Sequence, residues 1–502
     1  MAADDNAGLR VVTRSKRSDR VTDVLAWAAI LLALTPWPAA VPESVPVASG
    51  SMFFSDIVMF AALIGVFFSL KRGRVQWPQW PLDWNRRLLR PWRDPAQALA
   101  GALVVFLVFA SVVGALSGAD PHYFFRDARG PAILMSGMLV GIYLWQRPST
   151  WRWGLRALAA ILTMAALLSL LEMVGVTQGF LTGEVGEPVR RSIDGQVTVF
   201  SSRDVRTAAT SSATIIASIY ASGIALQGPS LRLRRLVHWI GVTSLVIVAV
   251  GLARNGLVAI VIAIAVVCAI GAFNFGKGRL ARGLVLLATY AFSGLLFLWL
   301  LYLVGVGRDF MSTFVGRVIG GLSADVAFSE SSLTWRVIET QLGWERLIES
   351  PITGIGFGVP YRDRGIGGWE IFSGQDGLYY THNNYLYLGI KAGFLVAGIV
   401  ILALASTVLR LLSRRVAENG DGVLRVAVGA SLVGVLAVAW VSPVLTHRDS
   451  APLIGALLAL AMVRLSNHAK DTGEALIVTA TATPSRGWRP WRNARQQPVV
   501  GA

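Results

Sequence analysis

Apolar runs of about 20 residues dominate the chain, and this is the length of helix that crosses the hydrocarbon core of a bilayer. Because a backbone in lipid must satisfy its own hydrogen bonds, such runs predict helices. The sequence therefore predicts an all-α fold, a polytopic transmembrane helix bundle of about twelve spans. The expected spans are residues 23–41, 52–70, 96–117, 128–146, 155–176, 208–227, 237–253, 255–272, 284–305, 383–408, 423–445 and 452–465.

The distribution of Lys and Arg orients these spans. Cations gather before the first span, in the loop at 71–95 and in every second loop after it. Since Lys and Arg accumulate on the cytoplasmic side, both termini are predicted to be cytoplasmic. Five regions follow: a basic cytoplasmic arm (1–22), spans one to nine (23–305), a large extracytoplasmic loop with an amphipathic helix (306–382), spans ten to twelve (383–465) and a disordered cytoplasmic tail (466–502).

Composition excludes several classes of protein. With 54% hydrophobic and 15% charged residues, the chain is too apolar for a soluble enzyme, and the orientation of the spans accounts for the net charge of +17 without nucleic acid. One cysteine, Cys268, excludes disulfide and cysteine-rich metal sites. No His-x-x-x-His or Asp-x-Asp spacing occurs, so no metal or other cofactor is expected.

The large outer loop is expected to form a small helical cap. Apolar and aromatic residues recur at helical spacing over residues 332–349, which predicts an amphipathic helix lying on the membrane, either as part of a site or as a structural lid. The glycines that follow, Gly354, Gly356 and Gly358, lack the strand and helix of a nucleotide-binding loop. They predict a tight outer turn, or a close approach to a ligand or another helix.

His382 is the first candidate for a catalytic residue. It is the only histidine in the large outer loop, and it lies at the start of span ten. An imidazole at the membrane boundary can take a proton from a sugar hydroxyl if a neighbour such as Asn383 holds its other nitrogen. The alternative is an interfacial histidine that hydrogen-bonds at the headgroup level.

Outer-face arginines are the second signal, because they oppose the positive-inside rule. Arg254 interrupts two apolar spans, and Arg206 precedes span six. Several guanidinium groups that converge from different loops would clamp a diphosphate without a metal. The alternative is ion pairing with outer carboxylates such as Asp204 or Asp127.

The layout and a few short segments resemble the O-antigen ligase and polymerase superfamily of bacterial membrane glycosyltransferases. The resemblance covers most of the chain as a layout: twelve spans, both ends inside and a large periplasmic loop between spans nine and ten. Its specific residues are Arg336 and Trp344 ahead of the glycine segment, His382-Asn383, Gly393, the segment around Arg254, and Arg206 before span six.

The resemblance implies a metal-independent, inverting transferase. A glycan would move from an undecaprenyl-diphosphate carrier to an acceptor hydroxyl on the outer face of the plasma membrane. His382 would be the general base, and Arg206, Arg254 and Arg336 would hold the diphosphate. Asn383, Tyr385, Trp344 and Gly393 would support the site. Two alternatives stay open: a polymerase of lipid-linked repeat units, and a non-catalytic exporter or flippase of lipid-linked sugars.

Overall fold

The computed structural model is largely helical. It describes residues 19–36, 44–47, 50–72, 95–173, 184–193, 196–206, 209–227, 235–251, 254–274, 277–303, 331–363, 378–413 and 422–463. Most of the basic arm, the tail and much of the large outer loop lie outside these residues.

Each expected span coincides with a helical segment. The first is helical over 19–31 and continues as η1 (Leu32–Leu34). The others, in chain order, are α2 (Phe54–Lys71), α4 (Pro95–Leu116), α5 (Pro121–Trp145), α6 (Pro148–Met173), α7 (Ala209–Gln227), α8 (Arg235–Val250), α9 (Arg254–Asn274), α10 (Lys277–Leu303), α14 (Asn384–Leu412), α16 (Gly422–Val438) and α17 (Ala451–Leu458), which ends in η9 (Ala459–Ala461).

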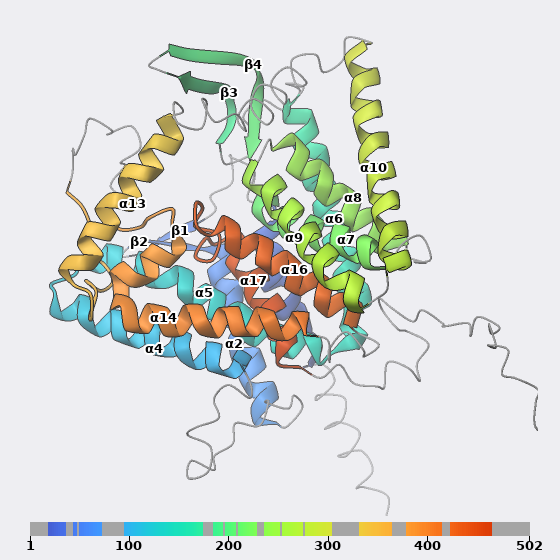
Figure 1. The fold of residues 1–502 in the computed structure, drawn as a ribbon. Coiled ribbons are helices and arrows are strands. Elements are labelled where there is room, and N and C mark those ends of the chain that lie inside the picture. The colour runs from blue at the N-terminus through green and yellow to red at the C-terminus, as the bar shows by residue number, and fades with distance from the viewer. Residues whose placement is uncertain are drawn as a thin grey trace, which may run out of the picture.

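Among the described residues, seven of these helices are long and apolar enough to cross a membrane: α2, α4, α5, α6, α7, α9 and α14. Shorter apolar helices lie at α8, α10, α16 and α17. The helical, membrane-spanning class is confirmed at this level. One further helix, α13 (Ser331–Glu349), lies beside the bundle (Figure 1). Its boundaries are close to the expected 332–349.

Glycines bring the helices into close contact. A Cβ built on Gly137 of α5 would lie 2.4 Å from the carbonyl oxygen of Pro452, and one on Gly455 of α17 would lie 2.2 Å from that of Leu134. Gly434 of α16 approaches the backbone of α9 in the same way. Small residues at crossings are typical of helices that associate in lipid, where apolar burial gives little preference for protein over lipid.

Two short antiparallel hairpins depart from an all-α fold. β1 (Ser44–Val47) pairs with β2 (Gly50–Phe53), and β3 (Glu184–Ile193) pairs with β4 (Gln196–Arg206). The β3–β4 hairpin packs against α6 and α8 at one edge of the bundle (Figure 1). The sequence did not predict this hairpin, because its strands alternate polar and apolar residues only weakly.

Candidate functional site

His382 and Glu339 form a pair between helix α13 and the start of α14. The ring nitrogen Nδ1 of His382 lies 2.9 Å from Oε2 of Glu339, and the backbone N–H of His382 donates to the same oxygen at 3.1 Å. The Glu339 side chain is 3% exposed and that of His382 is 30% exposed. A carboxylate that accepts from Nδ1–H leaves Nε2 as the acceptor nitrogen of the ring.

Glu339 occupies a buried stripe along α13. Trp335, Glu339, Gly343 and Leu347 recur every four residues, and all four are buried. Gly343 permits the approach, because a Cβ there would lie 2.7 Å from the Leu386 side chain on α14. A carboxylate within such a stripe needs a partner, and His382 supplies one. Glu339 was not among the residues expected from the sequence, because its spacing along α13 does not show that this face meets α14.

The apolar residues of α13 have two kinds of surroundings. Trp335 and Leu347 are buried within the protein, whereas Val337 is 68% exposed and Trp344 is 51% exposed. Trp344 meets Phe394 edge-on, with ring centroids 5.7 Å apart. α13 therefore packs on the protein through part of its apolar surface, and the rest of that surface is exposed.

Asn383 has a different role from the one expected. Its side-chain oxygen accepts from the backbone N–H groups of Tyr385 and Leu386 and caps α14, so Glu339 and not Asn383 holds the second ring nitrogen of His382. Asn384 donates to Thr446 Oγ1 at 3.0 Å and accepts from the N–H of Leu445. These contacts fix the backbone on which His382 stands.

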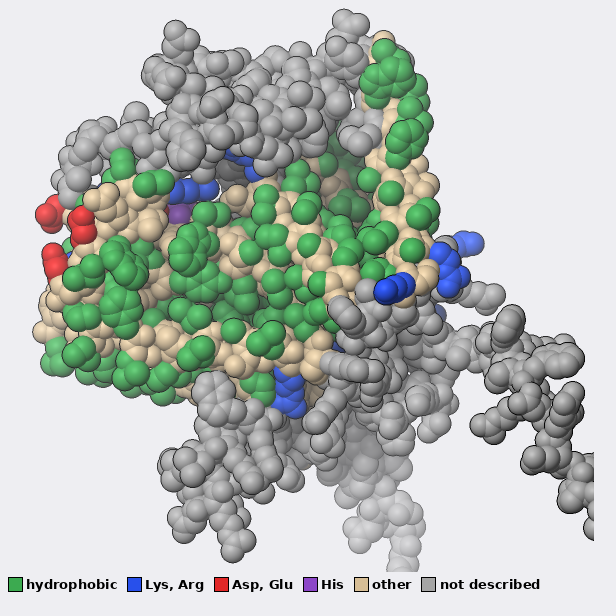
Figure 2. Space-filling view, in the orientation of Figure 1, with side chains coloured by type: hydrophobic (Ala, Val, Ile, Leu, Met, Phe, Trp, Pro, Cys, Tyr) green, Lys and Arg blue, Asp and Glu red, His purple; other side chains and the backbone are tan. Residues whose placement is uncertain are grey.

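Tyr385 supports this end of α14 from the other side, because its hydroxyl donates to the carbonyl of Leu436 at 2.6 Å. Tyr380 and His382 have ring centroids 5.8 Å apart, and Tyr379 stacks on Tyr123 of α5 at 3.7 Å. In Figure 2 a purple His side chain lies beside blue Lys or Arg side chains on the face between α13 and the bundle. Aromatic rings and a titratable group thus share this region.

Tyr361 and Arg362 close the site behind Glu339. The Tyr361 hydroxyl donates to Oε1 of Glu339 at 3.4 Å. Burial, together with the nearby Glu339 charge, raises the pKa of Tyr361 well above its usual range. The Arg362 guanidinium lies over the Trp335 ring, 4.8 Å from its centroid, and is buried. The Glu339 carboxylate therefore has bonding partners on both oxygens, with a cation close by.

The glycine segment is inserted between helices and is more than an outer turn. Gly393 has φ 74° and interrupts α14, and the N–H groups of Ile355 and Gly356 donate to the carbonyls of Ile390 and Lys391 just before that break. The N–H of Phe357 donates to Ala110 of α4 at 3.0 Å. The break in α14 leaves these carbonyl groups without helical partners, and the glycine segment donates hydrogen bonds to them. The close approach to another helix, which the sequence offered as one possibility, is found.

Only glycine fits at the tightest point. Gly356 has φ +81°, and a Cβ there would lie 2.0 Å from the backbone nitrogen of Gly114. Gly354 and Gly358 also have positive φ. Left-handed backbone and contact with a second backbone both exclude larger residues at these positions.

A buried ion pair lies beneath the segment. Lys391 Nζ lies 2.6 Å from Oδ2 of Asp127, and their side chains are 0% and 3% exposed. Lys391 also donates to the carbonyl of Val359, and the N–H of Gly358 donates to Asp127. The pair ties α5, α14 and the glycine segment together. Pairing of Asp127 with an arginine was the alternative reading of the sequence, and the structure pairs this carboxylate with Lys391.

The three arginines expected to bind diphosphate lie on separate elements. Arg336 is on α13, one turn before Glu339; Arg254 begins α9; and Arg206 ends β4, where only the backbone is described. The segment at 446–450 runs between the His382 and α7 regions, because Thr446 bonds Asn384 and the carbonyl of Asp449 accepts from Ser212. Thr210 of α7 in turn adjoins Gly251, just before Arg254.

This segment carries a further cation, Arg448, that was not among the arginines expected from the sequence. Arg448 pairs with Asp449 at 3.2 Å and lies over Phe53, as does Arg129 from α5. Arg129 pairs with Asp56 at 2.8 Å. Within the described residues, no group of three His, Cys, Asp or Glu side chains could hold a metal ion.

Comparison with known families finds no matching family model, and comparison with curated proteins finds no matching relative.

Proposed function

We propose that this chain is a membrane glycosyltransferase that resembles the O-antigen ligases. It transfers an oligo- or polysaccharide from undecaprenyl diphosphate to an acceptor hydroxyl on the outer face of the bacterial plasma membrane. The observation that carries the proposal is the His382–Glu339 pair, in which a buried carboxylate holds one nitrogen of a partly exposed imidazole. A carboxylate that orients one imidazole nitrogen and leaves the other as an acceptor is the arrangement of a general base, which favours catalysis over transport.

The proposed reaction is a direct displacement. Nε2 of His382 takes the proton of the acceptor hydroxyl, and the oxygen forms a bond to the anomeric carbon. The bond from that carbon to the diphosphate oxygen breaks, with inversion, and the electron pair leaves with undecaprenyl diphosphate. Glu339 stabilises the imidazolium that forms, as the buried carboxylate of a catalytic triad does.

Outer arginines stabilise the leaving diphosphate in this scheme. One guanidinium group can donate two parallel hydrogen bonds to phosphate oxygens. Stabilising the negative charge that develops on the leaving diphosphate lowers the barrier to transfer. Arg336 is supported best, since it shares α13 with Glu339. Arg254 is linked to the site through α7 and the segment at 446–450. Arg206 rests on the resemblance alone.

The proposed topology has twelve spans, with both termini in the cytoplasm and His382 at the outer end of the bundle. The twelve helical segments and the cation-rich alternate loops support it. α13 forms the outer cap over the sugars, and the surrounding bundle receives the polyprenyl chain.

The test uses purified protein in vesicles with a lipid-linked oligosaccharide donor and an envelope glycolipid acceptor. We expect His382→Ala to abolish transfer while donor binding, followed by titration, stays within twofold of the wild type. His122→Ala is the control, because His122 is an exposed histidine at the start of α5. Full transfer by His382→Ala would overturn the proposal. Product sizing separates a ligase from a polymerase, which would lengthen the lipid-linked chain.

A further inference from the structure

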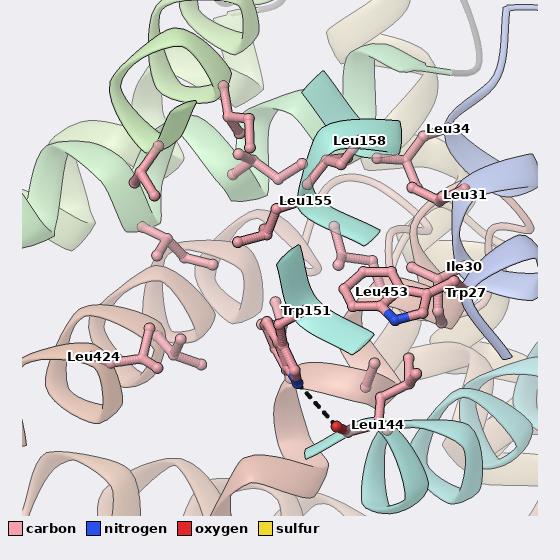
Figure 3. A pocket seen from close by; sticks show the side chains of 18 of the residues that line it. Trp27, Ile30, Leu31, Leu34, Leu144, Trp151, Leu155, Leu158, Leu424 and Leu453 are labelled. Atoms are coloured by element: carbon pink, nitrogen blue, oxygen red, sulfur yellow. Dashed lines mark hydrogen bonds between the residues drawn. The ribbon is translucent and has the colours of Figure 1, made fainter. Parts of the chain in front are cut away.

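An apolar cavity lies at the end of the bundle away from His382. It is lined from seven helical segments, including the N-terminal helix, α6, α8 and α16 (Figure 3). The carbonyl of Ala439, just after α16, bonds Asn384 beside the site, whereas Leu424 lines the cavity 15 residues earlier. At 1.5 Å per residue that separation is about 20 Å.

The wall of the cavity is apolar, because the polar atoms of its aromatic residues are hydrogen-bonded to other protein groups. Trp27 donates to Thr150, and Trp145 donates to the Ala456 carbonyl. Trp151 donates to the Leu144 carbonyl (Figure 3). The Tyr220 hydroxyl lies 2.6 Å from Nδ1 of His238. A water molecule needs two or more polar partners, so a cavity lined in this way favours a hydrocarbon occupant over water, sugar or phosphate.

The cavity has the dimensions of a hydrocarbon chain end. Its volume is about 180 Å³, and an apolar cavity of about 150 Å³ takes up benzene. It begins at the end of the bundle, beside Trp151 in the first turn of α6, and reaches Leu158 of the same helix. Seven residues of helix give a depth of about 10 Å.

Exposed arginines stand beside the lining residues at this end. Arg152 and Arg156 directly follow Trp151 and Leu155 on α6, and Arg235 precedes Val237 at the start of α8. Each cation near a membrane surface strengthens attraction to anionic lipid, by about fivefold. The apolar cavity suits an acyl chain, and the adjacent cations suit a negative headgroup. An anionic lipid carries both groups in one molecule.

We infer that this cavity binds one acyl chain of an anionic phospholipid, whose headgroup lies on Arg152, Arg156 and Arg235. Under the proposed topology the lipid belongs to the cytoplasmic leaflet, on the side opposite the proposed transfer site. The inference uses that topology only to assign the leaflet. It does not depend on the transferase activity.

The test is photocrosslinking in phosphatidylcholine vesicles that contain phosphatidylglycerol with a diazirine on one acyl chain. We expect adducts on Trp151, Leu155 or Leu158, located by mass spectrometry of the digested protein. Leu155→Trp fills the cavity and should reduce these adducts at least fivefold. Val261→Trp adds the same bulk on an exposed position of α9 and should leave them unchanged.

A second variant tests the inference independently if Leu155→Trp fails to fold. Replacing Arg152, Arg156 and Arg235 with Gln leaves the lining intact and should reduce the crosslinking at least fivefold. The matched control replaces Lys71, Lys277 and Arg282, which are exposed cations near other helix ends. Equal loss in both triple variants would overturn the headgroup site. Adducts formed by a diazirine-bearing polyprenyl diphosphate, and absent with phosphatidylglycerol, would overturn the choice of lipid. Transfer assays on the same samples keep this outcome separate from the proposed function.

Discussion

Glu339 is the residue whose replacement tests the proposed mechanism most directly. Its Oε2 atom accepts from both the backbone N–H and Nδ1 of His382. In Glu339→Gln the amide oxygen can occupy the same position and keep both bonds, so the variant removes the charge and preserves the geometry. In Glu339→Ala both bonds are lost and the imidazole is released.

The expected magnitudes follow from these contacts. A hydrogen bond to a charged group contributes about 1.5–3 kcal/mol and one between neutral groups about 0.5–1.5 kcal/mol. Replacing the carboxylate by an amide therefore costs about 1.4 kcal/mol at the barrier, or about tenfold in the rate of transfer. Loss of both bonds costs about 3 kcal/mol, or about 100-fold.

The assay measures single-turnover transfer from saturating lipid-linked donor, so that binding and chemistry are separated. We expect donor affinity to be unchanged in both variants, because Glu339 lies behind His382 and is 3% exposed. Glu345→Gln is the matched control, since Glu345 is an exposed glutamate on the same helix. Wild-type rates in Glu339→Ala would refute the role assigned to the pair.

Three further predictions concern the scaffold. Lys391→Met leaves the Asp127 carboxylate buried without its cation and should lower the free energy of unfolding by about 3–5 kcal/mol; denaturation in detergent measures this, and adding Asp127→Leu should recover much of the loss. Gly356→Ala should prevent normal folding, because its Cβ would overlap the Gly114 backbone, whereas Gly398→Ala meets nothing within 4 Å and should fold normally; gel filtration separates the two outcomes. The pKa of Tyr361 is higher in the folded chain than its ordinary value of about 10. The neutral phenol therefore contributes its full stabilisation at pH values below about 10, and this stabilisation is lost as the pH rises further. Proteolysis of the α13 region should then increase more steeply with alkaline pH in the wild type than in Tyr361→Phe, and identical profiles would contradict this cause.

Helix positions were the part of the fold most readily predicted from the sequence. Apolar length alone placed the twelve helical segments, because a span must satisfy its backbone internally. The β3–β4 hairpin was missed, since its short strands carry charged and polar residues and lack a strong period of two. The break in α14 at Gly393 was also missed, because it depends on the inserted segment at 354–358.

The candidate site was predicted only in part. His382 and Asn383 were recognised at the start of α14, but the partner of His382 lies 43 residues away along the chain. Sequence spacing does not reveal which buried face meets which helix, so Glu339 and Tyr361 went unassigned. Lys391 was overlooked within an apolar span because its partner, Asp127, belongs to a distant helix. Tertiary pairing decides all of these roles.

The inserted glycine segment constrains how α13 can move. The C-terminal end of α13 leads directly into residues that bond α4 and α14, so that end is anchored inside the bundle. Any displacement of α13 must then be a tilt about this anchor, in which its N-terminal part swings and the anchored end stays in place. Under the proposed reaction, such a tilt would carry Glu339 away from His382 and would leave the imidazole without its carboxylate until α13 returned.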